Sequence, residues 1–231
     1  MMKLFFLLLI LITSSTFPTF CISQELKDDY DKVYNMDPEL YNGQVFTEIY
    51  RGNIKGSQFF IDQDFVSGDL QLITKKYLDQ SLNYDVYNQK LLLSFEDKNG
   101  AQKIIELPLE NVQSFYMYSK YFEVFDGDGK SKMIFQVFSF KKNKILIHWS
   151  KNLKSSASQG YTVRQFNSLK KKIWIVFDGV MHPINKNQDL ISLYPIDKQS
   201  ELKSWLKENK LKIKKAEDPQ LTLIANYLDE M

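Results

Sequence analysis

The chain has 231 residues, one cysteine and a formal net charge of +2. Its residues are 44% hydrophobic and 25% charged, which excludes an intrinsically disordered chain because enough apolar surface is available to build a core. A single cysteine excludes an internal disulfide and a cysteine-based zinc site.

The N-terminal residues have the pattern of a signal peptide. Lys3 supplies a positive charge, and residues 4–12 are nine consecutive apolar residues. A transmembrane helix needs about 20 such residues, so this run suits the shorter apolar region of a signal peptide. We expect residues 1–23 to be removed by cleavage after Ser23, which leaves Gln24 first. The alternative is lipidation at Cys21, although Phe20 stands where a lipoprotein site usually has a small residue.

Residues 41–184 are predicted to form β-strands. Apolar and polar residues alternate through most of this region, and turn sequences such as Asn99-Gly100 and Asp178-Gly179 separate the alternating runs. Residues 152–160 are rich in serine and contain few large apolar side chains, so they favour a mobile loop.

Residues 186–231 change to a helical period. Leu202, Trp205 and Leu206 share one face of a predicted helix, and a second predicted helix begins with Asp218 as its N-cap and Pro219 at its first position. Strands followed by helices predict an α+β fold. We expect a single domain over residues 24–231, in which C-terminal helices follow a mainly antiparallel, curved sheet like a meander or half-barrel.

Charge is unevenly distributed along the chain. Residues 24–129 carry a net charge of −9, residues 130–215 carry +14, and residues 216–231 carry −4. The basic region predicts either solvated turns or a surface that contacts anionic lipid or polysaccharide. Arginine is rare, which argues against a nucleic-acid partner because base recognition depends on bidentate arginines. The candidate basic surface consists of Lys141, Lys142, Lys144, Lys170, Lys171 and Lys172.

No catalytic or metal-binding pattern is present in the sequence. His148 and His182 lie 34 residues apart, outside any metal motif, and no Gly-x-Ser-x-Gly sequence occurs. Residues 126–129 (DGDG) resemble the start of a calcium loop, but Ser131 and Val137 occupy the positions that need glycine and a bidentate acid. We therefore predict no catalytic residue, no metal and no cofactor.

Aromatic residues are concentrated between residues 115 and 125. They occur at both odd and even positions, so a strand would carry them on both of its faces. One interpretation is that both faces are covered, for example by the C-terminal helices. The other is a pocket for an apolar ligand, whose predicted lining residues are Tyr84, Tyr116, Tyr118 and Phe122.

Several different short motifs follow one another along the chain. They are Tyr41-Asn42-Gly43, Gly56-Ser57-Gln58-Phe59-Phe60, Gly68, Leu82-x-Tyr84-Asp85, Asp178-Gly179 with Pro183-Ile184, Leu193-Tyr194-Pro195, and residues 206–211. In this order they resemble an uncharacterised family of secreted proteins typical of Bacteroidota. The resemblance implies a location in the cell envelope or outside the cell, and it implies no activity, cofactor or site residue.

These patterns lead to one functional expectation and one alternative. We expect an exported, non-enzymatic envelope protein with a structural or binding role, located in the periplasm, at the outer membrane or outside the cell. Its expected partner is another envelope protein or an anionic lipid or polysaccharide surface. The alternative is a periplasmic carrier or sensor that holds an apolar ligand in a pocket between sheet and helices.

Overall fold

The computed structural model describes residues 37–47, 54–61, 64–126, 131–141, 143–158 and 161–231. It divides into two compact units, residues 1–41 and 42–231. In the first unit the described residues form a turn, where the backbone N–H groups of Leu40 and Tyr41 donate to the Asp37 carbonyl at 3.1 and 3.0 Å. The expected signal peptide, including Cys21, lies outside the described residues.

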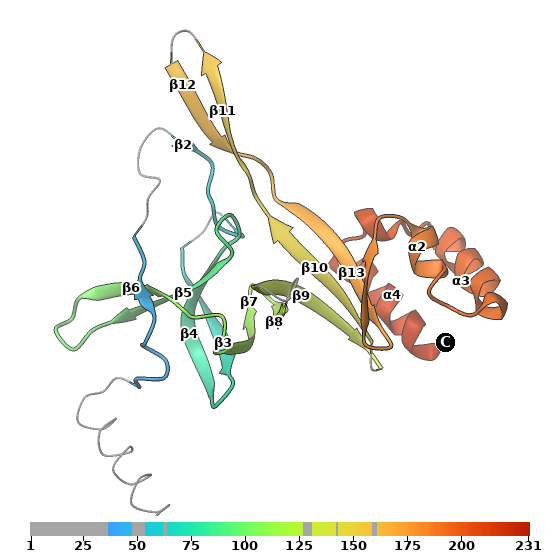
Figure 1. The fold of residues 1–231 in the computed structure, drawn as a ribbon, viewed down its shortest axis with the longest axis horizontal. Coiled ribbons are helices and arrows are strands. Elements are labelled where there is room, and N and C mark those ends of the chain that lie inside the picture. The colour runs from blue at the N-terminus through green and yellow to red at the C-terminus, as the bar shows by residue number, and fades with distance from the viewer. Residues whose placement is uncertain (1–36, 48–53, 62–63, 127–130, 142, 159–160) are drawn as a thin grey trace, which may run out of the picture. The chain divides into compact units, whose positions relative to one another are not determined.

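The second unit begins with strands and ends with helices, which confirms the predicted order of an α+β fold (Figure 1). The strands are β1 (Gln44–Val45), β2 (Ile54–Lys55), β3 (Val66–Leu72), β4 (Lys76–Asp85), β5 (Lys90–Glu96), β6 (Gln102–Glu106), β7 (Val112–Met117), β8 (Lys120–Asp126), β9 (Lys132–Phe140), β10 (Asn143–Ser150), β11 (Leu153–Ser158), β12 (Tyr161–Phe166), β13 (Lys170–Phe177) and β14 (Val180–Ile184). The helices are α2 (Asn187–Ile191), α3 (Ile196–Glu208), the 3-10 helix η1 (Ile213–Lys215) and α4 (Asp218–Glu230).

Eleven strands form one antiparallel sheet in the order β1-β6-β5-β4-β3-β7-β8-β9-β10-β13-β14. Its edge strands are β1 and β14, so the sheet is not closed. The predicted mainly antiparallel sheet is therefore confirmed, and its half-barrel curvature stays a prediction. None of the helices in the described part of the chain is long and apolar enough to cross a membrane.

A second, three-stranded sheet contains β11, β12 and β2. Its β11–β12 hairpin continues from β10 and β13, and Figure 1 shows it as a two-stranded arm. The expectation of a loop over residues 152–160 is wrong for Leu153–Ser158, which forms strand β11. This strand pairs with β12 along its whole length, with Leu153 opposite Phe166 and Ser158 opposite Tyr161. Strand pairing depends on backbone groups, so a serine-rich segment can form a strand when a partner lies beside it.

Helices cover one face of the C-terminal strands. Ile145 and Ile147 of β10 and Ile173 and Ile175 of β13 are buried on this face. They pack against the apolar faces of the helices, which include Leu190, Leu202, Leu206, Leu221, Ile224 and Leu228. The helical spacing of these leucines and isoleucines therefore marks the face that contacts the sheet.

The N-terminal strands enclose an aromatic core. Phe115 of β7 and Phe122 of β8 stack with ring centroids 4.8 Å apart, and Tyr84 lies 5.9 Å from Phe122. Phe60 contacts both Tyr84 and Phe122. Along β7, Phe115 is buried and Tyr116 is exposed, as expected for a strand with one face in the core and one open to solvent.

Helix α4 begins with a different cap from the predicted one. Glu217, rather than Asp218, occupies the N-cap, and its backbone N–H donates to Gln220 Oε1 at 3.0 Å. The Asp218 carboxylate instead accepts hydrogen bonds from Lys120 and from Gln136 Nε2. Asp218 therefore joins the start of α4 to β8 and β9.

Candidate functional site

A shallow groove of about 380 Å³ lies on the solvent-facing side of β3, β4, β7 and β8. Its volume is at the lower end of the range of about 300–1,000 Å³ that is typical of small-molecule sites. Its lining combines two tyrosines with charged and polar groups from neighbouring strands. The lining residues are Asp69, Gln71, Lys76, Ser114, Phe115, Tyr116 and Tyr121. We call this the tyrosine groove.

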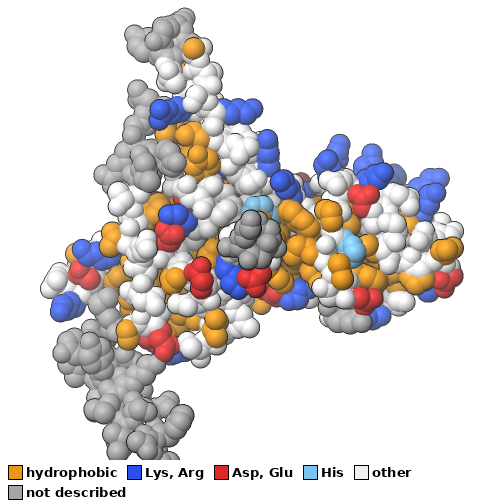
Figure 2. Space-filling model, viewed as in Figure 1, with side chains coloured by type: hydrophobic (Ala, Val, Ile, Leu, Met, Phe, Trp, Pro, Cys, Tyr) orange, Lys and Arg blue, Asp and Glu red, His pale blue; other side chains and the backbone are white. Residues whose placement is uncertain are grey.

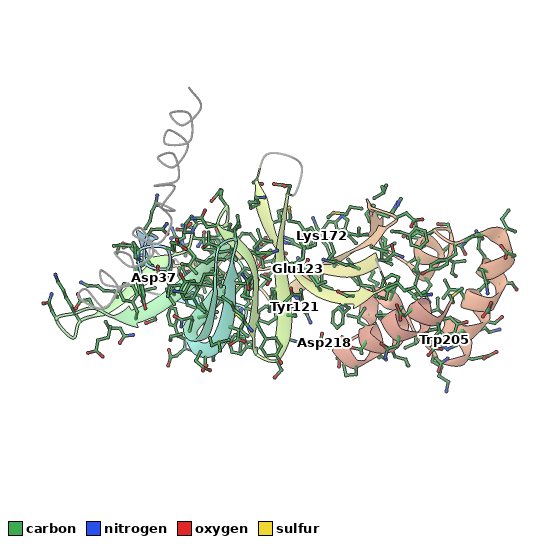
Figure 3. All side chains as sticks on the ribbon, turned by 90° about the horizontal axis from the view of Figure 1, so that it is seen from below. Asp37, Tyr121, Glu123, Lys172, Trp205 and Asp218 are labelled. Atoms are coloured by element: carbon green, nitrogen blue, oxygen red, sulfur yellow. The ribbon has the colours of Figure 1, made fainter. Side chains whose placement is uncertain are left out.

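Strand register brings the two tyrosines together. Tyr116 of β7 is paired with Tyr121 of β8, and it is also paired with Asp69 of β3 on its other side. Paired residues on neighbouring antiparallel strands point to the same face, with Cβ atoms about 4.5–5.5 Å apart. Tyr116 and Tyr121 are 47% and 42% exposed, so both rings are accessible to a ligand. Figure 3 labels Tyr121.

A β-bulge shapes one side of the tyrosine groove. Gly68 pairs with Gln80 whereas Leu70 pairs with Tyr77, so β4 contains one residue more than β3 over this stretch. Asp79 adopts a positive φ of 54° there. Its backbone N–H lies 3.4 Å from Asp69 Oδ1, and the other Asp69 oxygen lies 3.1 Å from Lys76 Nζ. Bulges redirect side chains, and this one holds Asp69 and Lys76 beside the tyrosines.

Glycine is required at position 68 because β3 approaches β7 closely there. A Cβ atom on Gly68 would lie 2.4 Å from the backbone oxygen of Tyr116. A side chain would therefore push β3 away from β7 and separate Asp69 from Tyr116.

The groups in the groove are suited to binding. The Asp69 and Lys76 side chains are 37% and 55% exposed, and an ion pair this accessible contributes little to stability. Both groups can therefore exchange their mutual contact for hydrogen bonds to a ligand. The tyrosine rings offer apolar faces beside these charges. Among the described lining residues there is no imidazole or thiol.

A second cleft, of about 460 Å³, lies near the β4–β5 turn. Lys90 Nζ and Glu106 Oε2 within it are 2.5 Å apart, so these two charges already satisfy each other. Its lining contains no aromatic residue among Asn42, Gly43, Gln44, Asn88, Gln89, Lys90, Glu106, Leu107, Pro108, Leu109, Glu110, Ser131 and Lys132. The tyrosine groove is the better candidate because it presents two exposed rings.

The four residues of the predicted apolar pocket lie in different environments. Tyr84 and Phe122 are fully buried in the aromatic core, and the Tyr84 hydroxyl donates to Gln89 Oε1 at 2.8 Å. Burial raises the pKa of Tyr84. Tyr118 lies in the β7–β8 turn and donates to the Asp64 carbonyl at 3.3 Å, whereas Tyr116 faces the groove. The structure thus brings Tyr84 and Phe122 into direct contact, and the Tyr118 ring lies 6.2 Å from Phe60 at the edge of the same core, whereas Tyr116 is on the other face.

The predicted basic residues are also divided between faces. Successive side chains of β13 point to opposite faces of the sheet. Lys171 packs near Trp149 and donates to the Ala216 carbonyl. Lys172, on the other face, lies opposite His148. Burial lowers the pKa of Lys171, whereas the negative charge of the Asp218 carboxylate acts to raise it.

The remaining predicted basic residues lie on other strands and turns. Lys144 Nζ lies 2.5 Å from Glu123 Oε2. Lys141 is exposed in a turn, Lys170 is exposed on β13, and Lys142 lies outside the described residues.

Among the interactions of the described residues, neither histidine is paired with a carboxylate group. His148 packs beside Phe135 and Trp174, and its Nδ1 lies 3.3 Å from the Ile134 carbonyl oxygen. Burial lowers the pKa of His148, and the charge of Lys172 acts in the same direction. His182 lies on the edge strand β14. Within the described ranges, no three His, Cys, Asp or Glu residues are grouped closely enough to hold a metal ion.

Sequence reasoning did not identify most of the tyrosine groove. Asp69, Gln71 and Lys76 lie on strands that carry no chemical motif, and Tyr121 was only one member of an aromatic run. The useful signal would have been Gly68, which lies inside a predicted strand of alternating apolar and polar residues. A glycine in such a strand indicates a bulge or a close approach of another backbone. Comparisons with protein-family models, with curated proteins and with solved structures found no match to this chain.

Proposed function

We propose that the protein is an exported, non-enzymatic binding protein of the cell envelope, in the periplasm or at the outer membrane, and that the tyrosine groove is its binding surface. The pattern of residues 1–23 supports export. The observation that carries the binding role is the pair of exposed rings, Tyr116 and Tyr121, beside the accessible ion pair of Asp69 and Lys76.

The exposure of this tyrosine pair needs a reason beyond folding. The aromatic core on the other face of β7 and β8 is built by Phe115 and Phe122, which are almost completely buried. Tyr116 and Tyr121 are exposed and paired with each other, and neighbouring exposed aromatic rings are a feature of binding surfaces. A binding role gives these two rings a function at the position where the strands place them.

The alternative, a carrier of an apolar ligand, receives no support from the aromatic core. The rings of Phe60, Tyr84, Phe115 and Phe122 pack on one another with centroid separations between 4.8 and 6.3 Å. Side chains in such contact occupy the space that an apolar ligand would need.

A basic strip on the helical part is the second contact surface that we propose, for an anionic lipid or polysaccharide surface. It consists of the exposed residues Lys210, Lys212, Lys214 and Lys215. Leu211 and Ile213 are buried between them, which directs the neighbouring lysines outward. Figure 2 shows Lys and Arg side chains gathered over the helices at the upper right.

Export can be tested on protein recovered from its native cells. We expect the intact mass to correspond to a chain that begins at Gln24. A diacylglycerol-modified chain that begins at Cys21 would establish the lipidated form, which is also an exported protein. A full-length chain with Met1 present in the cytosolic fraction would contradict export.

The binding role can be tested by co-sedimentation with purified cell envelopes. We expect the double variant Tyr116→Ala/Tyr121→Ala to lose most of the retention that the unmodified chain shows. Leu223→Ala is the matched control, because Leu223 is 45% exposed on α4 and does not line the groove. Equal retention of the double variant and the control would show that the tyrosine groove is not the binding surface.

A further inference from the structure

We propose that the tyrosine groove binds a neutral polysaccharide, with sugar rings stacked on Tyr116 and Tyr121 and sugar hydroxyls bonded to Asp69 and Lys76. This inference rests on the proposed binding function and adds the chemical class of the ligand.

The paired tyrosines match the apolar face of a sugar ring. A pyranose carries C–H bonds on its faces and hydroxyl groups around its rim. The C–H hydrogens are slightly positive, and the face of an aromatic ring is negative, so a sugar ring is attracted to a tyrosine ring in face-to-face contact. Tyr116 and Tyr121 are cross-strand neighbours, which places two such faces next to each other.

The polar residues of the groove match the rim of a sugar ring. The Asp69 carboxylate can accept hydrogen bonds from two adjacent hydroxyl groups, and the Lys76 ammonium group can donate to a hydroxyl oxygen. Hydrogen bonds that involve a charged group are stronger than those between neutral groups. Gln71 and Ser114 offer further polar groups on the same lining.

The charge and openness of the groove favour a neutral polymer. Asp69 and Lys76 are the only charged residues in the described lining and they neutralise each other, so the groove presents no net charge that would attract an anionic chain. A lipid tail would bring no hydrogen bonds to replace those that the charged groups make with water. The groove lies on a sheet face and holds about 380 Å³, so it can contact a short stretch of a long chain while the rest continues into solvent.

The experiment is affinity electrophoresis of the full chain in gels that contain soluble neutral polysaccharides, namely a β-glucan, a mannan, a galactan or a xylan. We expect retardation in at least one gel. Tyr121→Ala should weaken binding about tenfold, and Asp69→Asn should weaken it to a similar extent. Tyr121→Phe keeps the ring and should retain most of the affinity, and Leu223→Ala should bind like the unmodified chain.

Periodate oxidation of envelope polysaccharides separates this inference from the proposed function. If the groove variants lose envelope binding, and oxidised envelopes no longer retain the unmodified chain, a saccharide ligand is supported even when no polymer in the panel binds. If the groove variants lose envelope binding but oxidation has no effect and the panel shows no retardation, the binding function stands and the saccharide ligand is overturned. If groove variants bind polysaccharide as well as the unmodified chain does, the assigned site is overturned.

Discussion

At the scale of single residues, Asp85 has the lowest exposed fraction of the charged groups in the described structure. Its side chain is fully buried at the end of β4. Its carboxylate accepts four hydrogen bonds, from Gln58 Nε2, from the backbone N–H groups of Tyr87 and Asn88, and from Asn88 Nδ2. Burial raises the pKa of Asp85, while the hydrogen bonds from Asn88 and Tyr87 oppose that shift. Asp85 therefore fixes the β4–β5 turn.

We expect Asp85→Asn to lower the free energy of unfolding by about 2–4 kcal/mol. The substitution replaces one accepting oxygen with an NH₂ group, so the N–H groups that donated to that oxygen lose their acceptor. Chemical denaturation measures this change. Asp79→Asn is the control, since Asp79 lies in the exposed bulge and asparagine tolerates its positive φ. Its effect should stay within about 0.5 kcal/mol. Equal effects of the two substitutions would show that the buried hydrogen bonds are unimportant.

His148 makes stability depend on pH. Its folded pKa lies below the ordinary imidazole value of about 6.5, so the unfolded chain binds a proton more readily than the folded chain does. Lowering the pH through that value therefore favours unfolding. The groups that face the imidazole are Phe135, Trp174, Lys172 and the Ile134 carbonyl, and none of these is an acid that could stabilise the protonated ring.

We expect the melting temperature of the unmodified chain to fall more between pH 7.5 and pH 5.5 than that of His148→Gln. His182→Gln removes the same number of imidazoles and serves as the control, which should follow the unmodified chain. The explanation would be wrong if His148→Gln and His182→Gln gave the same decrease.

At the scale of elements, α4 is attached to the sheet by a polar network as well as by its apolar face. Asp218 accepts from Lys120 of β8 and Gln136 of β9, and Gln136 Oε1 accepts from Trp149 Nε1 of β10 at 2.9 Å. Gln136 is almost completely buried, so its amide depends on these partners. Figure 3 labels Asp218 at the start of α4.

We expect Asp218→Ala to destabilise the protein by about 1–3 kcal/mol, because the buried Gln136 amide loses its acceptor and Lys120 loses its counter-charge. Hydrogen exchange should accelerate most in the first turns of α4. Asp229→Ala, at the other end of the same helix, should change neither property. Unchanged exchange in Asp218→Ala would show that apolar packing alone holds α4.

At the scale of the whole molecule, the small net charge conceals a basic segment, residues 130–215, between two acidic segments. The basic strip lies in the positive region, and among the ion pairs of the described residues none involves its four lysines. Long-range attraction to an anionic surface therefore remains available to them.

We expect the unmodified chain to co-sediment with vesicles of equal parts phosphatidylglycerol and phosphatidylcholine at low salt, and to be released as salt screens the charges. Replacing Lys210, Lys212, Lys214 and Lys215 with Gln should weaken this binding at least about tenfold. The control replaces four lysines outside the basic strip, Lys55, Lys75, Lys98 and Lys103, with Gln, which removes the same total charge. Equal losses would mean that total charge, and not the basic strip, determines binding. The same comparison on polygalacturonate would show whether a polysaccharide can replace the lipid.

The order of elements could be predicted from the sequence because it depends on local periodicity. The change from alternation to helical spacing after residue 184 marks the boundary between sheet and helices, and Ile184 is the last residue of β14. The uneven distribution of charge is likewise a property of the sequence alone. Leu153–Ser158 shows the limit of this reasoning, because its strand depends on pairing with β12 and not on its own composition.

Only the tertiary structure decided which side chains form the candidate site. Tyr116, Tyr121, Phe115 and Phe122 belong to one aromatic run, and strand register alone places the two tyrosines outside and the two phenylalanines inside. A shift of one residue would exchange these faces. The bulge beside Gly68 then brings Asp69 and Lys76 to the tyrosines from other strands. Local periodicity therefore determined the fold class, whereas the groove was decided by register between strands, which depends on the packing of the whole sheet.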